Sequence, residues 1–278
     1  MTTAVDTMHE ISHDLTPTTL GRVTAVADLQ TRTDRKYLLP AAEWRAVVTR
    51  WRERLRALEI SGLRQFDYES VYFDTPDLLA YHRHAHGRRV RFKIRTRSYL
   101  DSAQTTLEIK TRGGRGETVK DRHEYGLDER YELNSEAQAL VDERLGTQLR
   151  GQRPAFSMIT RYLRSTLLDV TAGSRLTCDV GLAFTDSRHH RRAPDDLVLV
   201  ESKTTGRSTP VETSLWRMGH RPVSISKYCT GLALLHPWLP ANRWNRTLRQ
   251  YFDWEPTPHA HRKPSAREVT GRRQVETV

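Results

Sequence analysis

The sequence predicts an α+β fold in which an antiparallel sheet curls around a polar lumen and helices pack over its outer face. Three neighbouring segments, 88–97, 105–112 and 118–125, alternate charged with apolar residues at the two-residue period of a strand. Two other segments, 44–58 and 135–149, repeat apolar residues at helical spacing instead. Charged faces on adjacent strands favour a sheet whose polar side is enclosed and whose apolar side is covered by these helices.

A chain of 278 residues can bury a full-sized core, and one domain of about 200 residues with tails is the simplest division. We expect a flexible arm over residues 1–20, one domain over 21–240, and a basic tail over 241–278 that is largely disordered from about residue 255. Two cysteines, no signal peptide and no long apolar run predict a cytoplasmic protein without a transmembrane segment.

The charge balance predicts an anionic partner. The chain carries 45 Lys and Arg residues against 34 Asp and Glu residues, a net charge of +11. Residues 241–278 hold eight basic and four acidic residues, or +4, so the remaining +7 belongs to the folded body. Nucleic acid, a phosphorylated small molecule and a membrane surface all fit this charge. Specific nucleic acid binding is disfavoured, because the aromatic residues have core spacing and no stacking platform is evident.

Residues 31–40, TRTDRKYLLP, predict a short strand that places Asp34 and Lys36 on one face. Pro40 ends this strand and suits the first turn of a helix. The apolar residues that follow have helical spacing, so we expect a helix whose tryptophans pack in the core; they are Trp44, Val47, Val48, Trp51, Leu55 and Leu58. Residues 68–74 alternate again as a strand.

The segment 88–97, RRVRFKIRTR, has the most unusual pattern in the chain. Its basic residues all share one face of the strand; they are Arg89, Arg91, Lys93, Arg95 and Arg97. Same-face neighbours are roughly 7 Å apart, so each pair repels by roughly 2 kcal/mol at an effective dielectric of about 20. No Asp or Glu is interleaved within the strand, so we favour a polyanion-binding face over the alternative, a solvated outer face.

Three histidines, His82, His84 and His86, lie two residues apart before the basic strand. We expect them to be exposed on a connecting segment. A metal site is the alternative, but no Cys or carboxylate accompanies them.

The second half of the chain continues the alternation of strands and helices. Residues 105–112 and 118–125 predict strands joined by a glycine-rich loop, which lacks the Lys-Ser/Thr ending of a nucleotide-binding loop. A capping-box pattern at Ser135 and Gln138 begins the helix over 135–149. Further strands are predicted at 158–169, 174–184 and 197–203, and further helices after Pro210 and over 224–235.

The residues expected on the inner face are mostly cationic: Lys36, Arg89, Arg91, Lys93, Arg95, Lys110, Lys120, Arg164, Arg175, Lys203 and Lys227. The carboxylates are few, chiefly Asp34, Glu108, Glu124, Asp179 and Glu201. No Ser-His-Asp order, zinc spacing or dinucleotide fingerprint occurs. Phosphoryl transfer needs cations around phosphates, a divalent metal on a carboxylate, and an in-line nucleophile, and this set of residues matches that need.

Seven motifs occur in order between about Asp28 and Pro240: TDRKYLL, VRFKIRTRSY, LEIKT, RYLR, RLTCDV, LVESK and SISKY. Together they resemble the polyphosphate polymerase domain of the vacuolar transporter chaperone (VTC) family, one of the triphosphate tunnel metalloenzymes. The resemblance implies a closed antiparallel β-barrel with helices on the outside. It also implies an ATP-dependent polymerase that transfers the γ-phosphate of ATP onto a growing inorganic polyphosphate chain and releases ADP.

The resemblance also implies which residues line the tunnel. We assign catalytic roles to Lys36, Arg91, Lys93, Arg95 and Lys227, with Arg91 included because it shares their face. We assign phosphate and nucleotide binding to Lys110, Lys120, Tyr162, Arg164, Arg175, Lys203 and Ser226. Glu201 would hold the divalent metal, Mn²⁺ or Mg²⁺. Asp34 stands where these proteins usually have Glu, which shortens the reach of that carboxylate.

Several of these assignments have a structural alternative. Glu201 could be only the salt-bridge partner of a tunnel arginine, and Lys36 a charge at the rim. Tyr162 could be a core residue with a satisfied hydroxyl, and Ser226 only a helix N-cap. Two other functions also remain: a metal-dependent triphosphate hydrolase on the same barrel, and a non-catalytic protein that binds polyphosphate or nucleotide. The small number of carboxylates weighs against the hydrolase, which must position water.

Overall fold

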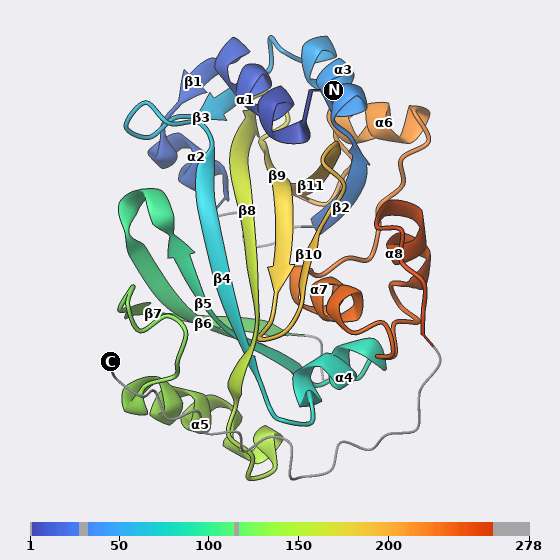
Figure 1. The fold of residues 1–278 in the computed structure, drawn as a ribbon. Helices are drawn as coiled ribbons and strands as arrows, with labels where there is room; N and C mark the ends of the chain where they lie inside the picture. The colour runs from blue at the N-terminus through green and yellow to red at the C-terminus, as the bar shows by residue number, and fades with distance from the viewer. Residues whose placement is uncertain (1, 28–32, 114–116, 258–278) are drawn as a thin grey trace, which may run out of the picture.

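The computed structural model describes residues 2–27, 33–113 and 117–257 (Figure 1). The strands are β1 (Thr16–Thr18), β2 (Thr33–Pro40), β3 (Leu55–Leu58), β4 (Phe66–Asp74), β5 (Arg91–Tyr99), β6 (Gln104–Arg112), β7 (Thr118–Tyr125), β8 (Ala155–Asp169), β9 (Ser174–Thr185), β10 (His190–Arg192) and β11 (Leu197–Thr204). The helices are α1 (Ala4–Asp14), α2 (Leu20–Ala27), α3 (Ala41–Arg50), α4 (Leu79–Ala85), α5 (Ser135–Leu149), α6 (Pro210–Arg217), α7 (Lys227–Leu235) and α8 (Asn245–Tyr251), with a 3₁₀ turn at Leu100–Ser102.

The strands form one sheet in the order β2-β11-β9-β8-β4-β5-β6-β7, and every pair along this path is antiparallel. The predicted α+β class with an antiparallel sheet is confirmed. The sheet curls, so that the start of α7 reaches strands on both sides: Ser226 accepts from Lys93 of β5, and Lys227 pairs with Asp179 of β9. Over the described residues, however, no strand pairing joins β2 to β7, so the predicted closed barrel is not confirmed.

Helices cover the outer, apolar face of the sheet in two groups. Helices α1, α3 and α6 pack on β2, β8, β9 and β11, where Met8, Trp44 and Leu215 share a buried cluster with Leu176 and Val200. Helix α5 packs beside β6 in a second cluster. The prediction that Trp44 is a core residue is confirmed by its full burial. No helix among the described residues is both long enough and apolar enough to cross a membrane.

The N-terminal segment differs from the loose arm predicted for residues 1–20. Thr3 caps α1 in a capping box with Asp6, and β1 pairs in parallel with β3. The buried residues of this segment include Met8, Ile11 and Leu15, which hold the helix against the core. Packing of a few apolar residues at helical spacing therefore orders a segment whose composition is mostly polar.

The C-terminal segment is also more ordered than predicted between residues 241 and 254. Trp244 and Leu248 are buried, and the indole N–H of Trp254 donates to the carbonyl of Ala233 at 2.8 Å. Helix α8 is thereby fixed to α7. The predicted disorder from about residue 255 falls almost entirely on 258–278, which lies outside the described residues.

Two local predictions are wrong. The helix expected up to Leu58 ends at Arg50, and Leu55–Leu58 forms β3 because it pairs with β8. His82 and His84 lie in α4 rather than on a connecting segment, whereas His86 follows the helix and is exposed as predicted. His84 Nε2 is 3.2 Å from the carbonyl oxygen of Phe92, and burial, followed by nearby Lys93 and Arg91, lowers the pKa of His84 to about 2.

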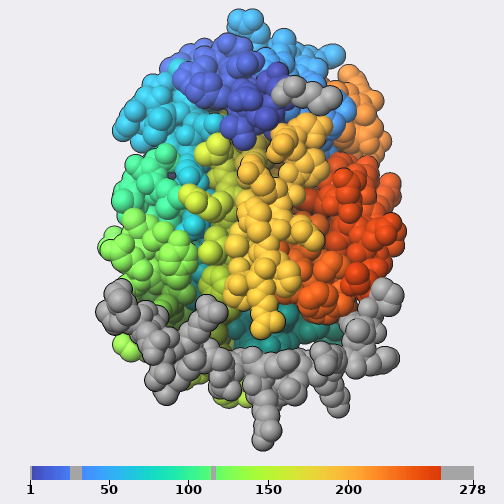
Figure 2. All heavy atoms as spheres, viewed as in Figure 1, coloured from blue at the N-terminus to red at the C-terminus, as the bar shows by residue number. Residues whose placement is uncertain are grey.

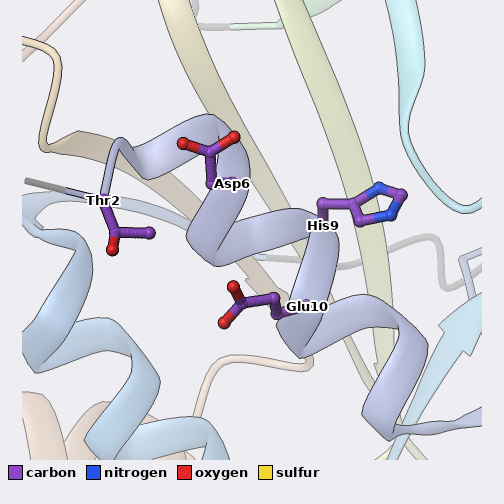
Figure 3. A pocket seen from close by; sticks show the side chains of 4 residues that line it. All are labelled: Thr2, Asp6, His9 and Glu10. Carbon is purple, nitrogen blue, oxygen red and sulfur yellow. The ribbon is translucent and has the colours of Figure 1, made fainter.

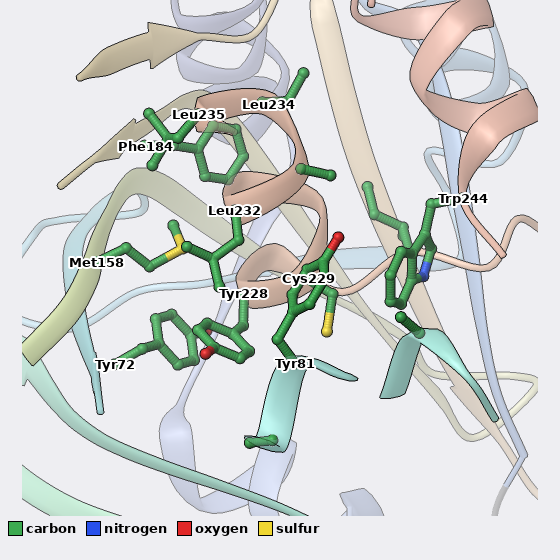
Figure 4. Packing of buried hydrophobic residues seen from close by; sticks show 14 of the residues in the cluster. Tyr72, Tyr81, Met158, Phe184, Tyr228, Cys229, Leu232, Leu234, Leu235 and Trp244 are labelled. Carbon is green, nitrogen blue, oxygen red and sulfur yellow. The ribbon is translucent and has the colours of Figure 1, made fainter. Parts of the chain in front are cut away.

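Helix α7 is packed tightly against β8 and β9, among the aromatic and sulfur-containing side chains of Figure 4. A Cβ atom at Gly231 would lie 2.4 Å from Met158 Cε and 2.5 Å from Phe184 Cδ1. The methionine end can move, but the phenylalanine ring is held in the core. Glycine at this position therefore sets how closely α7 approaches the sheet.

We expect Gly231→Ala to lower the free energy of unfolding by about 1–3 kcal/mol, because the added methyl group overpacks the core. Gly146→Ala in α5 is the matched control, since nothing lies within 4 Å of a Cβ built there. That change should raise stability by roughly 0.5–1 kcal/mol through helix propensity. Chemical denaturation of both variants checks the pair, and a stabilised Gly231→Ala protein would contradict the tight packing.

Candidate functional site

Three lysines stand side by side on the inner face of the sheet. The strand register places Lys93 of β5 opposite Lys110 of β6, and Lys110 opposite Lys120 of β7. We call these three residues the lysine row. Directly opposed residues have Cβ atoms about 4.5–5.5 Å apart, so like charges there destabilise the sheet. The two-residue alternation of β5, predicted from the sequence, is what points Lys93 inward and buries Phe92 and Ile94 on the other side.

The lysine row holds its charge at a cost. Burial lowers the pKa of Lys93, and Lys36, Arg95 and Arg91 lower it further. The pKa of Lys110 is lowered by burial and then by Lys93 and Lys36. Burial lowers the pKa of Lys120 to about 7, although its ion pair with Glu108 acts in the opposite direction. An anion with several oxygens would remove this cost, because it stabilises the charged form of all three.

Glu108 neutralises basic side chains on the same face, two residues along β6 from Lys110. Its carboxylate accepts from Arg95 Nε at 2.7 Å, and it pairs with Lys120 at 2.7 Å and with Arg122 at 3.2 Å. These cations outweigh burial and hold the pKa of Glu108 well below its usual range. The predicted uncompensated repulsion along β5 is therefore wrong at Arg95, whose partner comes from the neighbouring strand. It holds for Lys93, which has no ion pair among the described residues.

A second group of charges lies on β8, β9 and α7. Arg164 donates to both carboxylate oxygens of Asp179, at 2.6 and 2.8 Å, and Lys227 pairs with the same carboxylate. We call Arg164, Asp179 and Lys227 the Asp179 cluster. Asp179 is only 1% exposed, and the two cations hold its pKa below its usual value in spite of burial. The pairing of β8 with β9 opposes Arg164 to Asp179, so the sheet itself creates this contact.

Tyr162 lies under the Asp179 cluster. The ring centroid is 4.2 Å from Lys227 Nζ and 5.2 Å from the guanidinium carbon of Arg164. The hydroxyl is buried and has no hydrogen-bond partner among the described residues. Burial raises the pKa of Tyr162, but the nearby cations Arg97, Arg164 and Lys227 lower it more, so the net shift is downward. An unsatisfied hydroxyl surrounded by cations differs from the satisfied core hydroxyl that was the alternative.

Glu201 lies between two lysines on the inner face. Its carboxylate is 3.5 Å from Lys36 Nζ and 3.1 Å from Lys203 Nζ, because the β2–β11 register places Glu201 opposite Lys36. These lysines outweigh burial and hold the pKa of Glu201 well below its usual range. Its salt-bridge partners are lysines rather than the arginine considered above. A carboxylate with a lowered pKa also suits Mg²⁺ or Mn²⁺, which prefer oxygen ligands.

The start of α7 links the two groups of charges. Ser226 is the N-cap of α7, and its Oγ accepts from Cys229 N at 3.4 Å and from Lys93 Nζ at 2.7 Å. It is therefore both an N-cap and a contact of the lysine row. Tyr228, two residues later, donates to Asp74, which also accepts from the backbone N–H groups of α4. This buried anchor fixes the direction in which Ser226 and Lys227 point.

The remaining predicted residues also lie on inward-facing strand positions. Arg175 of β9 is opposite Lys203 of β11, which is opposite Asp34 of β2. Arg91 is opposite Arg112 at the start of β5. Arg97 was not assigned to the site, yet its guanidinium lies 5.9 Å from the Tyr68 ring centroid and near Glu108. The signal for Arg97 was present, since it shares the basic face of RRVRFKIRTR.

A surface hollow on α1 is a poor candidate for the site. It is lined by Asp6, His9 and Glu10 of the N-terminal helix and by Thr2, which precedes that helix (Figure 3). Helix α1 packs on α3 and on the outer face of the sheet, whereas the basic groups face inward. Two acidic side chains in a hollow also repel a phosphate.

The pKa of Lys120 leads to a testable coupling between anion binding and protonation. At about pH 8 most Lys120 side chains are neutral before binding, and a bound polyanion raises their pKa, so binding takes up protons. When tripolyphosphate binds, we expect the native chain to take up as much as about one proton more than the Lys120→Met variant does. Calorimetry in two buffers of different ionisation enthalpy measures the difference. Equal uptake by both proteins would mean that Lys120 does not titrate on binding.

Comparison with known proteins shows which family the chain resembles. A family model described as the VTC domain matches residues 31–236. No curated protein matches the chain.

Solved structures with similar folds share little sequence with this chain. An adenylyl cyclase candidate from Hippeastrum, described as having a dominant triphosphatase activity, is 16% identical, with 72% of this chain and 94% of that chain covered and a TM-score of 0.46. An adenylate cyclase candidate from Bacillus halodurans is 12% identical, with 70% and 94% covered and a TM-score of 0.40. The PH1819 protein from Pyrococcus horikoshii OT3 is 14% identical, with 71% and 93% covered and a TM-score of 0.39.

The match to the family model extends over most of the chain, from the start of β2 to the end of α7. It includes the lysine row, the Asp179 cluster, Glu201 and Ser226. The resemblance inferred from the seven motifs is thereby confirmed. The chain belongs to the VTC domain family.

Proposed function

We propose that this chain is a polyphosphate polymerase, which transfers the γ-phosphate of ATP onto the end of an inorganic polyphosphate chain and releases ADP. The observation that carries the proposal is the lysine row, in which Lys93 and Lys110 are directly opposed and have no ion pair among the described residues, while Lys120 shares Glu108 with arginines. An anion with several oxygens bound along the row would stabilise the charged form of these lysines. Membership of the VTC domain family supports the same substrate class.

Two separate groups of cations suit two phosphate chains. In our proposal the lysine row and Lys36 bind one chain, and Arg164, Arg175, Lys203 and Lys227 bind the other. The terminal oxyanion of polyphosphate is already a nucleophile, so alignment and charge neutralisation suffice without a general base. Its oxygen forms a bond to the γ-phosphorus as the bond from that phosphorus to the β,γ-bridging oxygen breaks. The bridging oxygen keeps its electron pair and leaves with ADP.

A divalent metal fits this proposal at Glu201. The carboxylate is ionised and faces the same side as the cations that would hold the phosphates. Mg²⁺ and Mn²⁺ are commonly held by one or two carboxylates together with substrate phosphates, and the bound ion neutralises charge on those phosphates. Lys36 and Lys203 would then move from Glu201 to phosphate oxygens. Asp34, opposite Lys203 in the register, is the second carboxylate within the same part of the sheet.

The closed barrel belongs to the same proposal. Lys36 of β2 and Lys110 of β6 already interact electrostatically, so the two ends of the sheet approach each other on the polar side. A polyphosphate chain bound to both lysines would bridge these ends. A passage formed in this way would let the product leave as it grows.

The test is incubation of the full chain with ATP and Mg²⁺ or Mn²⁺, followed by a gel that separates polyphosphate from orthophosphate. We expect ADP and acid-labile polymeric phosphate, with little free phosphate. Lys93→Met, which removes a lysine from the middle of the basic face, is the matched control. This variant should form neither ADP nor polymeric phosphate. If ATP yields only orthophosphate, the chain is a hydrolase. If ATP is bound but unchanged with each metal, it is a binding protein.

A further inference from the structure

A cluster of metal-binding residue types lies away from the two groups of phosphate-binding cations. Asp186 and His189 belong to the turn between β9 and β10, and His236 is the C-cap of α7. One ligand atom from each residue lies within 4.8 Å of the other two. His236 Nε2 is 2.8 Å from Asp186 Oδ2, and His189 Nδ1 is 3.2 Å from the same oxygen. Two imidazole nitrogens therefore lie beside one carboxylate oxygen.

The fold fixes each of these donors independently. Asp186 Oδ1 accepts from the backbone N–H groups of Arg188 and His189 at 2.7 and 2.6 Å, which leaves Oδ2 for other partners. The His236 ring packs on the ring of Trp238, with centroids 4.9 Å apart, and edge-on to His189 at 5.2 Å. The β9–β10 turn and the end of α7 lie beside each other because α7 packs on both strands (Figure 1).

We propose that Asp186, His189 and His236 bind one Zn²⁺ ion, with water at the fourth position. Two imidazoles and one carboxylate are donors that Zn²⁺ accepts, whereas Mg²⁺ prefers oxygen ligands alone. Tetrahedral zinc with bonds of about 2.0–2.2 Å needs donor atoms roughly 3.3–3.5 Å apart. The present separations from Asp186 Oδ2, 2.8 and 3.2 Å, are slightly shorter, so a small outward movement makes room for the ion.

The second ring nitrogen of His236 predicts a moderate affinity for Zn²⁺. His236 Nδ1 is buried and has no hydrogen-bond partner among the described residues, although metal-binding imidazoles usually donate from the other ring nitrogen. Loss of such a partner commonly weakens metal binding by about 10–100-fold. We therefore expect micromolar rather than nanomolar binding.

Zinc at this position would act on α7. The helix begins at Ser226 and Lys227, which contact the lysine row and Asp179, and its C-cap is His236. Asp179 lies on β9, and the turn that carries Asp186 directly follows that strand. The ion would thus add a second link between α7 and β9 at the opposite end of the helix. This role is independent of the polymerase proposal, because it concerns the stability of the helix and not phosphate transfer.

The experiment uses the full chain without a histidine tag, treated with a chelator and then titrated with Zn²⁺ by calorimetry. We expect one site per chain, and a rise in the melting temperature of roughly 5–10 °C at a hundredfold excess over the dissociation constant. Co²⁺ in place of Zn²⁺ should give the intense visible absorption of tetrahedral coordination. The test with Mg²⁺ uses the Glu201→Gln variant, which lacks the carboxylate proposed to hold a metal on the inner face. Mg²⁺ at the same concentration should leave the melting temperature of this variant unchanged.

Two ligand variants and one control decide the assignment. His189→Ala and His236→Gln should each weaken Zn²⁺ binding by at least about tenfold. His190→Ala is the control, because His190 is the adjacent histidine but contacts Thr185 Oγ1 at 2.8 Å and is not in the cluster. His189 is exposed, so its variant should fold even if His236→Gln does not. Native affinity in His189→Ala, or equal loss in His190→Ala, overturns the site.

Discussion

Lys93→Met should weaken the binding of tripolyphosphate by roughly ten- to a hundredfold and at the same time raise the stability of the chain without ligand. A charge-assisted hydrogen bond to phosphate contributes about 1.5–3 kcal/mol, which corresponds to this loss of affinity. The gain in stability follows from the lowered pKa of Lys93, which records that its charge is unfavourable in the folded chain. Methionine keeps most of the side-chain volume and removes the charge.

Arg95→Met is the matched comparison, two residues away on the same face. Arg95 is paired with Glu108 and also donates to the Tyr72 hydroxyl at 3.2 Å. Its removal leaves part of a buried carboxylate without a partner, so stability should fall by about 1–3 kcal/mol while phosphate binding also falls. Thermal unfolding and calorimetry with tripolyphosphate measure both quantities. Loss of stability in Lys93→Met would mean that the lysine row is a structural feature and not an anion site.

The opposite changes in stability expected for Lys93→Met and Arg95→Met show what the sequence could and could not predict. The two-residue alternation placed Lys93 and Arg95 on the inner face, because side chains of a strand alternate regardless of its partners. Which of them has a counter-charge depends on the register between β5 and β6, which puts Glu108 opposite Arg95 and Lys110 opposite Lys93. A shift by two residues would have put Glu108 opposite Lys93 or Arg97 instead, without changing the alternation. Register is set by the turn and by packing, so the sequence pattern did not contain it.

The same reasoning applies to the other parts of the fold. Asp179 was one of several inner carboxylates in the sequence, but its contacts with Arg164 and Lys227 require three separate elements to meet. The N-terminal helix was missed because its buried residues are diluted by threonines and histidines, and only packing against the sheet makes them a core face. The residues assigned from the family resemblance lie on one face of the sheet or at the start of α7. The resemblance did not establish closure, since the described strand pairing ends at β2 and β7.

Electrostatics relates these details to function. Three carboxylates of the inner face are already shared among cations: Glu108 with four, Asp179 with two and Glu201 with two. This arrangement orients the basic side chains without neutralising them all. Lys93 and Lys110 have no ion pair among the described residues, and an incoming polyphosphate would complete the charge balance. A preorganised set of cations is also what the transfer step needs, because it lowers the cost of bringing two anionic chains together.

Glu201→Gln should lower metal-stimulated turnover by at least about a hundredfold, because the change removes the ionised carboxylate proposed to hold the metal. The same change should tighten the binding of tripolyphosphate in the absence of metal, since Lys36 and Lys203 lose their counter-charge and turn to the ligand. Calorimetry with and without Mn²⁺ separates these effects. Glu212→Gln is the control, because Glu212 pairs with Arg35 on the other side of β2. Its loss should affect stability but not metal dependence. Full metal stimulation in Glu201→Gln would leave Glu201 only as the salt-bridge partner of the two lysines.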